Sequence, residues 1–231
     1  MRIGLWIFAV AALAFSGCTA PVARAPDVGA VDRLPARQAA RMFAQVVQTV
    51  EPVAESECRS RTRGVNCDFH IVVDDRPDQP PNAFQTLDRT GRPVIAFTVA
   101  LIADARNADE LAFVMGHEAA HHIEGHIARQ GQNAVAGAIL AGGLAVLLGG
   151  DQVLVDTVQR AGARVGARSY SKAFELEADA LGTLITHRAG YDPLKGAVFF
   201  SRIPDPGDRF LGTHPPNAQR LETVRATVAG L

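Results

Sequence analysis

The sequence predicts an α+β fold that is mostly helical, with a small sheet of three or four strands placed before a helix that carries a histidine pair. Three β-rich runs lie between residues 69 and 99, and helical periodicity dominates the chain on both sides of them. The 231 residues are 48% hydrophobic and 20% charged, which suits one globular domain with a substantial core. The formal net charge of −1 gives no basic excess, so we expect no nucleic acid partner.

The chain begins with the pattern of a bacterial signal peptide, expected over residues 1–17. Arg2 supplies a positive charge, and an uncharged apolar run follows it up to Phe15. Small residues then precede Cys18, as in a lipobox, so we expect acyl chains on Cys18 to tether the protein to a membrane. Phe15 stands where leucine is usual. The alternatives are an ordinary signal peptide cut nearby or an uncut anchor.

A lipidated tether is expected over residues 18–36, because Pro21, Pro26 and Pro35 interrupt any periodic pattern. The segment would place the protein on the periplasmic side of a bacterial membrane. The residue that follows Cys18 is Thr19 and not an aspartate, and this favours the outer membrane.

The first helix is expected over residues 37–50, with Phe43 and Val46 on its apolar face, and Pro52 is expected to end it. Cys58 and Cys67 follow. Because export implies an oxidising compartment, this pair favours a structural disulfide that closes an Arg-rich loop, and two free thiols are the alternative.

Three strands are expected over residues 69–73, 82–87 and 93–99, with a turn at residues 88–91. Pro93 is acceptable at the start of the third strand, where a ladder donor can be missing. A small sheet should therefore precede the helix with the histidine pair.

That helix contains the pattern H-E-x-x-H at His117, Glu118 and His121, and Asn107 is placed to cap its start. Residues four apart lie on one face of a helix, so the two imidazoles can hold one Zn²⁺ from the same side. Glu118 lies about 100° round the helix, where it can reach a water molecule beside the metal. The motif alone also occurs by chance in unrelated proteins.

A second polar group, Glu175 and Asp179, shares one face of a later helix. Glu175 can supply a third metal ligand, and Asp179 can accept a hydrogen bond from a ligand histidine. An exposed acidic face is the alternative for this pair. Glu177 points away from Glu175 and is expected to be solvated. His126, five residues after His121, does not share a helix face with it, so we expect His126 to be a structural residue.

Residues 134–150 form an uncharged segment near the lower length limit for a membrane span. A single crossing would separate His117 from Glu175 on opposite sides of a membrane. We therefore expect a helical hairpin that is packed or touches the membrane interface. Further helices are expected over residues 153–164, from 169 or 171 to 184, from 192 past 200, and over 217–229.

Three motifs in order, H-E-A-A-H, E-L-E-A-D and the Thr213-His-Pro-Pro216 run, resemble metallopeptidase family forty-eight, a gluzincin family. The resemblance covers residues 37 to 228. It implies a zincin-like metallopeptidase domain over residues 37–231, with one Zn²⁺ held by His117, His121 and Glu175. It also implies that Glu118 is the catalytic base and that Asp179 supports a ligand.

The family resemblance also implies that His214 faces the metal. His214 could then stabilise the oxyanion of the tetrahedral intermediate, or it could bind the zinc and hold the enzyme off. Arg220 matches a family arginine that could orient the His214 loop.

The expected function is that of a zinc endopeptidase of the bacterial envelope, in which a metal-activated water hydrolyses peptide bonds of unfolded or misassembled proteins. The substrate should lie extended along residues 82–85, as an added strand. The alternatives are a non-catalytic chaperone or assembly factor that uses the same groove, and a self-inhibited protease. The physiological substrate, the cleavage preference and the oligomeric state do not follow from the sequence.

Overall fold

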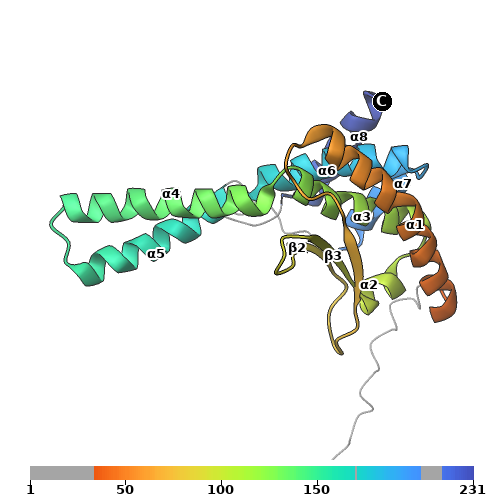
Figure 1. Cartoon of the computed structure of the whole chain (residues 1–231), viewed down its shortest axis with the longest axis horizontal. Helices are drawn as coiled ribbons and strands as arrows, with labels where there is room; N and C mark the ends of the chain where they lie inside the picture. Colours follow the sequence, from red (N-terminus) through yellow and green to blue (C-terminus); the bar gives the residue numbers. More distant parts are fainter. Residues whose placement is uncertain (1–33, 170, 204–214) are drawn as a thin grey trace, which may run out of the picture. The chain divides into compact units, whose positions relative to one another are not determined.

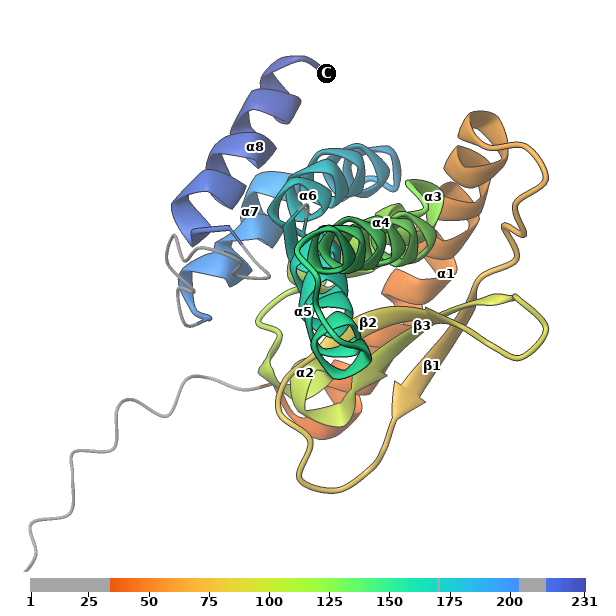
Figure 2. The ribbon, with the colours of Figure 1, turned by 90° about the vertical axis from the view of Figure 1, so that its left-hand side faces the viewer.

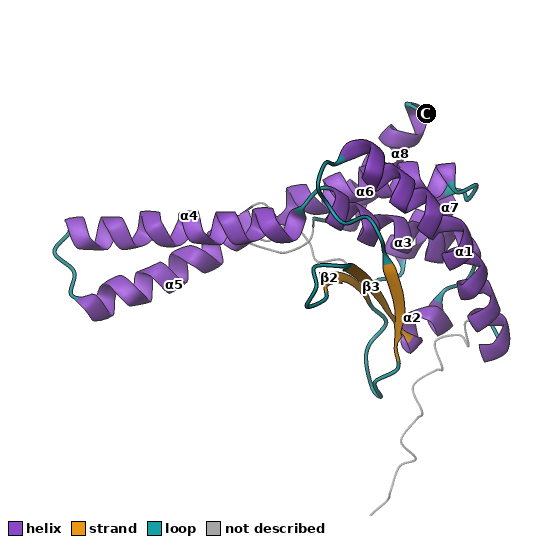
Figure 3. Cartoon of the chain, in the orientation of Figure 1, coloured by secondary structure: helices purple, strands orange, loops and turns teal. Residues whose placement is uncertain are grey.

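The structure is a computed structural model that describes residues 34–169, 171–203 and 215–231. The expected mostly helical α+β fold is confirmed, and Figures 1 and 3 show a small sheet next to several helices. The helices are α1 (Ala36–Arg61), α2 (Val99–Asp104), α3 (Ala108–Ile123), α4 (His126–Leu147), α5 (Gln152–Ser169), α6 (Ser171–Arg188), α7 (Pro193–Ala197) and α8 (Asn217–Ala229), with a short 3-10 helix, η1 (Val198–Ser201), after α7.

The sheet has three strands, β1 (His70–Asp74), β2 (Ala83–Leu87) and β3 (Pro93–Thr98), in the order β1-β3-β2. The central strand β3 pairs in parallel with β1 and antiparallel with β2. The third strand was expected to include Val99, but it ends at Thr98. The Thr98 hydroxyl accepts a hydrogen bond from the Leu101 amide and so caps α2, which the sequence analysis missed.

Helix α1 corrects the expectation that Pro52 ends the first helix, because α1 continues to Arg61 with Pro52 inside it. The missing amide of Pro52 removes one helical hydrogen bond. The continued helix buries Ala54 and Cys58 on the same face as Val46, and this burial offsets the loss. Cys58 forms a disulfide with Cys67, at a Cα–Cα distance of 5.7 Å.

The core lies between α1, α3, α6 and the sheet. The Phe43 ring of α1 packs on the Phe97 ring of β3, at 5.0 Å between ring centroids. Helices α3 and α6 approach each other through Gly116 and Gly182. A Cβ atom at position 116 would lie 2.8 Å from the Gly182 carbonyl oxygen. This contact holds the backbones of α3 and α6 close together.

Helices α4 and α5 form the expected hairpin, and the uncharged residues 134–150 lie in α4 and the turn after it. The two helices pack mainly on each other, which Figures 1 and 2 show from two directions. Gly137 and Gly162 meet at their contact. Leu140, Leu147 and Leu148 are exposed. None of the helices in the described part of the chain combines the length and hydrophobicity that a membrane span needs.

Candidate metal centre and active site

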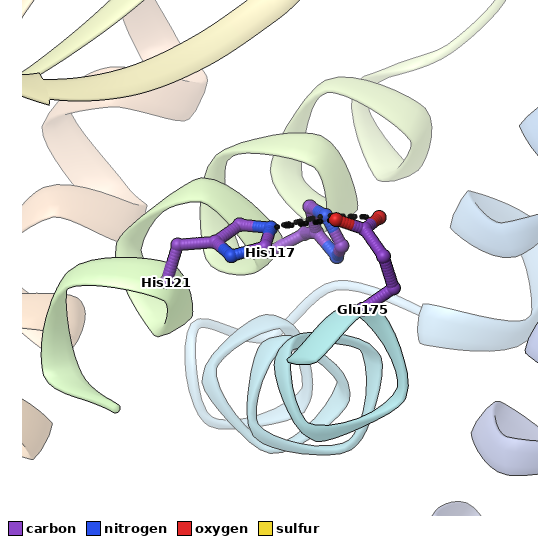
Figure 4. Close-up of side chains that lie close together, drawn as sticks. All are labelled: His117, His121 and Glu175. Atoms are coloured by element: carbon purple, nitrogen blue, oxygen red, sulfur yellow. Dashed lines mark hydrogen bonds and ion pairs between the residues drawn. The ribbon is translucent and has the colours of Figure 1, made fainter. Parts of the chain in front are cut away.

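His117 and His121 come from α3 and Glu175 from α6, and Figure 4 shows the three side chains directed at one point. The two ring Nε2 atoms lie 3.0 Å apart. The Glu175 carboxylate oxygens lie 3.6 Å from His117 Nε2 and 3.4 Å from His121 Nε2. Each residue therefore places one ligand atom within 4.8 Å of the other two. The spacing of the two histidines puts both rings on one helix face, because His121 is one turn after His117.

The outer nitrogen of the His117 ring is held by Asp179, one helical turn after Glu175. His117 Nδ1 donates to Asp179 Oδ1 over 2.9 Å. Arg220 of α8 donates to the same carboxylate through Nε at 2.8 Å and Nη2 at 2.6 Å. Asp179 is fully buried and Arg220 is 6% exposed. This network ties α3, α6 and α8 together behind the metal ligands.

The outer nitrogen of the His121 ring is held by His126, which corrects the expectation that His126 stands apart from His121. The two Nδ1 atoms lie 2.8 Å apart. Gly125, with a φ of 66°, allows the backbone turn between α3 and α4 that brings His126 back onto His121. His126 Nε2 lies 3.2 Å from Glu177 Oε2, and Arg129 donates to the same carboxylate. Glu177 is therefore paired with His126 and Arg129, which the sequence did not predict, while its side chain stays 39% exposed, in line with its expected solvation.

The electrostatics of the two ligand rings differ. Burial lowers the pKa of His117, but its bonds to the Asp179 and Glu175 carboxylates raise it to about 10 overall. Burial and the charge of His117 lower the pKa of His121 to about 3. The proton on His117 therefore adds a positive charge beside Glu175, which also faces Arg220 Nη2 at 3.6 Å. A divalent cation could replace this proton, and it would find two imidazole nitrogens and a carboxylate, the donor set typical of catalytic zinc sites.

Glu118 is half-buried beside this group and lines a cleft of about 580 Å³. Burial and the negative charge of Glu175 raise the pKa of Glu118. The cleft is also lined by residues 81–85, which include most of β2, and by aromatic residues such as Phe174 and Phe199. The carboxylate therefore lies in the same cleft as the edge of the sheet.

Residues 40–228 match peptidase family M48. The chain belongs to this family. The M48 domain is 28% identical over 174 residues to the mitochondrial metalloendopeptidase OMA1 of Saccharomyces cerevisiae, a match that covers 70% of this chain and 47% of that protein. It is 31% identical over 141 residues to the beta-barrel assembly-enhancing protease of Escherichia coli K12, covering 54% of this chain and 28% of that protein. The chain thus spans about half the length of the first of these relatives, and less of the second.

The structure of this M48 domain brings together His117, His121, Glu175 and Asp179, which the sequence analysis had placed in one site. Arg220 joins them through Asp179. His214 and Cys18 lie outside the described residues. The contact of His126 and Glu177 with the site was not predicted from the sequence. Local spacing gave no signal for it, because the partners of Glu177 lie on another helix.

Proposed function

We propose that this chain is a zinc-dependent endopeptidase that hydrolyses unfolded or misassembled proteins in the bacterial envelope. The observation that carries the proposal is the convergence of His117 Nε2, His121 Nε2 and the Glu175 carboxylate in a cleft that also holds Glu118. Membership of family M48 supports the same reaction class, since both matched relatives bear protease names.

The side chains divide the chemistry between them. Zn²⁺ held by His117, His121 and Glu175 would polarise the scissile carbonyl and lower the pKa of a water molecule. Glu118 accepts the proton of the attacking water and delivers it to the leaving amine nitrogen. The raised pKa of Glu118 suits this exchange, because a carboxylate that binds a proton more strongly than usual is a better acceptor for the proton of the water. Asp179 and Arg220 keep the His117 ring in place.

The proposed substrate lies extended along β2. Within the described part of the chain, β2 pairs with β3 on one side and has no strand on the other. A peptide added to this edge would be recognised through its backbone, so an extended chain of almost any sequence fits. Residues 82–85 line the same cleft as Glu118. This geometry suits unfolded polypeptides better than folded ones.

The proposed location is the periplasmic side of a bacterial membrane, with acyl chains on Cys18 as the anchor and the outer membrane as the favoured site. The signal-peptide pattern of residues 1–17 supports export. The name of the Escherichia coli relative, which refers to beta-barrel assembly, is consistent with an envelope substrate.

The test compares zinc content and casein cleavage for the wild type, Glu118→Gln and Glu222→Gln. Glu222 is exposed on α8 and serves as the matched control. We expect all three proteins to bind one zinc ion per chain. We expect Glu118→Gln to lose at least about 100-fold in cleavage rate, since it cannot accept the water proton. Full cleavage by zinc-loaded Glu118→Gln would reject the mechanism.

A further inference from the structure

We propose that His126 is a positioning residue that fixes the tautomer and the direction of the His121 ring. This inference rests on the proposed function, because it treats His121 as a metal ligand. The contacts that carry it are independent of catalysis. His126 opens α4, and its side chain is 5% exposed. Its Nδ1 faces His121 Nδ1 over 2.8 Å, while its Nε2 faces Glu177.

The hydrogen atoms in this chain of contacts can be placed by elimination. An ionised carboxylate only accepts hydrogen bonds, so His126 Nε2 carries a hydrogen and donates it to Glu177. In a neutral ring the other nitrogen, His126 Nδ1, is then an acceptor. The hydrogen between the two rings must therefore belong to His121 Nδ1. His121 Nε2 is left with a lone pair, which is the form that a metal ligand needs.

The His126 ring is itself held firmly. It stacks on the Phe174 ring of α6, with 4.6 Å between centroids and 10° between the planes. Arg129, one turn further along α4, donates to both oxygens of Glu177 and lies over the Phe174 ring. Glu177 is 39% exposed, so its charge alone stabilises little, and the stacked ring provides most of the orientation.

The two ligand rings are thereby supported in parallel ways. His117 Nδ1 donates directly to the Asp179 carboxylate. His121 Nδ1 donates to His126, and His126 in turn donates to the Glu177 carboxylate. Loss of a partner that orients a metal-bound histidine typically lowers metal affinity by about 10–100-fold. We expect a loss of this size when His126 can no longer accept a hydrogen bond.

The experiment uses His126→Phe, His126→Asn and the control His187→Phe in the full chain. Phenylalanine keeps a ring against Phe174 but accepts no hydrogen bond, whereas the asparagine carbonyl restores an acceptor close to the position of Nδ1. His187 is an exposed histidine on α6. Zinc affinity is measured by competition with a chromogenic chelator. The tautomer of His121 is read by nitrogen-15 NMR of the metal-free protein.

We expect the wild type to carry its ring hydrogen on His121 Nδ1. We expect His126→Phe to show mixed tautomers and about 10–100-fold weaker zinc binding, His126→Asn to recover most of both, and His187→Phe to match the wild type. If His126→Phe does not fold, Glu177→Gln replaces it. A glutamine amide can accept or donate a hydrogen bond, so His126 Nε2 no longer has to carry the hydrogen and the tautomer of His121 is no longer fixed.

Two results would overturn the inference: a wild type with the hydrogen on His121 Nε2, or a folded His126→Phe that binds zinc as tightly as the wild type. A purely structural use of His126 would lower stability without changing the tautomer. Absence of casein cleavage by zinc-loaded wild type would reject the proposed function alone, since the tautomer is measured without metal or substrate.

Discussion

Replacement of Asp179 by asparagine is expected to destabilise the fold and to weaken zinc binding together. The carboxylate is fully buried and accepts two hydrogen bonds from Arg220 and one from His117. An asparagine of the same shape has one acceptor oxygen, and its amide group would face donors. The buried guanidinium of Arg220 would also lose its main counter-charge.

The magnitude follows from these contacts. Removing one partner of a buried ion pair costs about 3–5 kcal/mol, because the other charge stays buried. We expect a value near the lower end, about 3 kcal/mol, since Glu175 remains 3.6 Å from Arg220 Nη2 and keeps part of the compensation. Zinc affinity should fall by about 10–100-fold, because His117 loses the partner that orients its ring.

The assay for Asp179→Asn is urea unfolding followed by circular dichroism, in the presence of a chelator so that bound metal does not contribute. Asp192→Asn is the matched control, because Asp192 caps α7 and asparagine is an equally good cap. The control should stay within about 0.5 kcal/mol of the wild type. An Asp179→Asn protein as stable as this control, with unchanged zinc affinity, would refute the reasoning.

Two further predictions concern parts of the fold outside the site. Gly162→Ala should loosen the α4–α5 hairpin by about 1–3 kcal/mol, because its Cβ would meet the Gly137 carbonyl. Gly143→Ala should instead stabilise the hairpin by about 0.5–1 kcal/mol, because position 143 of α4 faces open space. Hydrogen exchange of the α4 amides measures the stability change in both variants. Equal effects of the two substitutions would contradict the close contact of Gly137 with Gly162. For Glu57, burial raises the pKa, but hydrogen bonds from Arg61 and Arg188 outweigh burial and leave the pKa below the usual 4.5. Its stabilisation should be complete above the unfolded-state pKa and disappear as pH falls through the lowered folded-state pKa. The difference in unfolding free energy between wild type and Glu57→Gln should therefore shrink as the pH falls below 4.5, and a difference that stays constant would contradict this prediction.

The parts of the site that follow from helix geometry were predictable from the sequence. His117 with His121, and Glu175 with Asp179, are each four residues apart, so each pair shares a face whatever the rest of the chain does. That the two pairs face each other follows from tertiary contacts, which local spacing does not contain. The family resemblance supplied this step in the sequence analysis.

The wrong expectations have the same physical origin. Pro52 carries a local cost of about 3 kcal/mol in a helix interior, but burial of Ala54 and Cys58 in the core outweighs it. Helical periodicity correctly turned Glu177 away from Glu175. It could not show that Arg129 and His126 of α4 occupy that side. Helical periodicity therefore predicts the face of the helix on which a side chain lies. The residues that pack against that face come from distant parts of the chain.

The glycine contact between α3 and α6 has a consequence for the size of ion that the centre can accept. His117 directly follows Gly116, and Gly182 lies two turns after Glu175 on the opposing helix. The separation of the two backbones at this contact therefore sets how far the carboxylate stands from the imidazoles. A variant of the site for a larger cation would therefore have to begin with changes at Gly116 and Gly182, although neither residue has a side chain that could bind the metal.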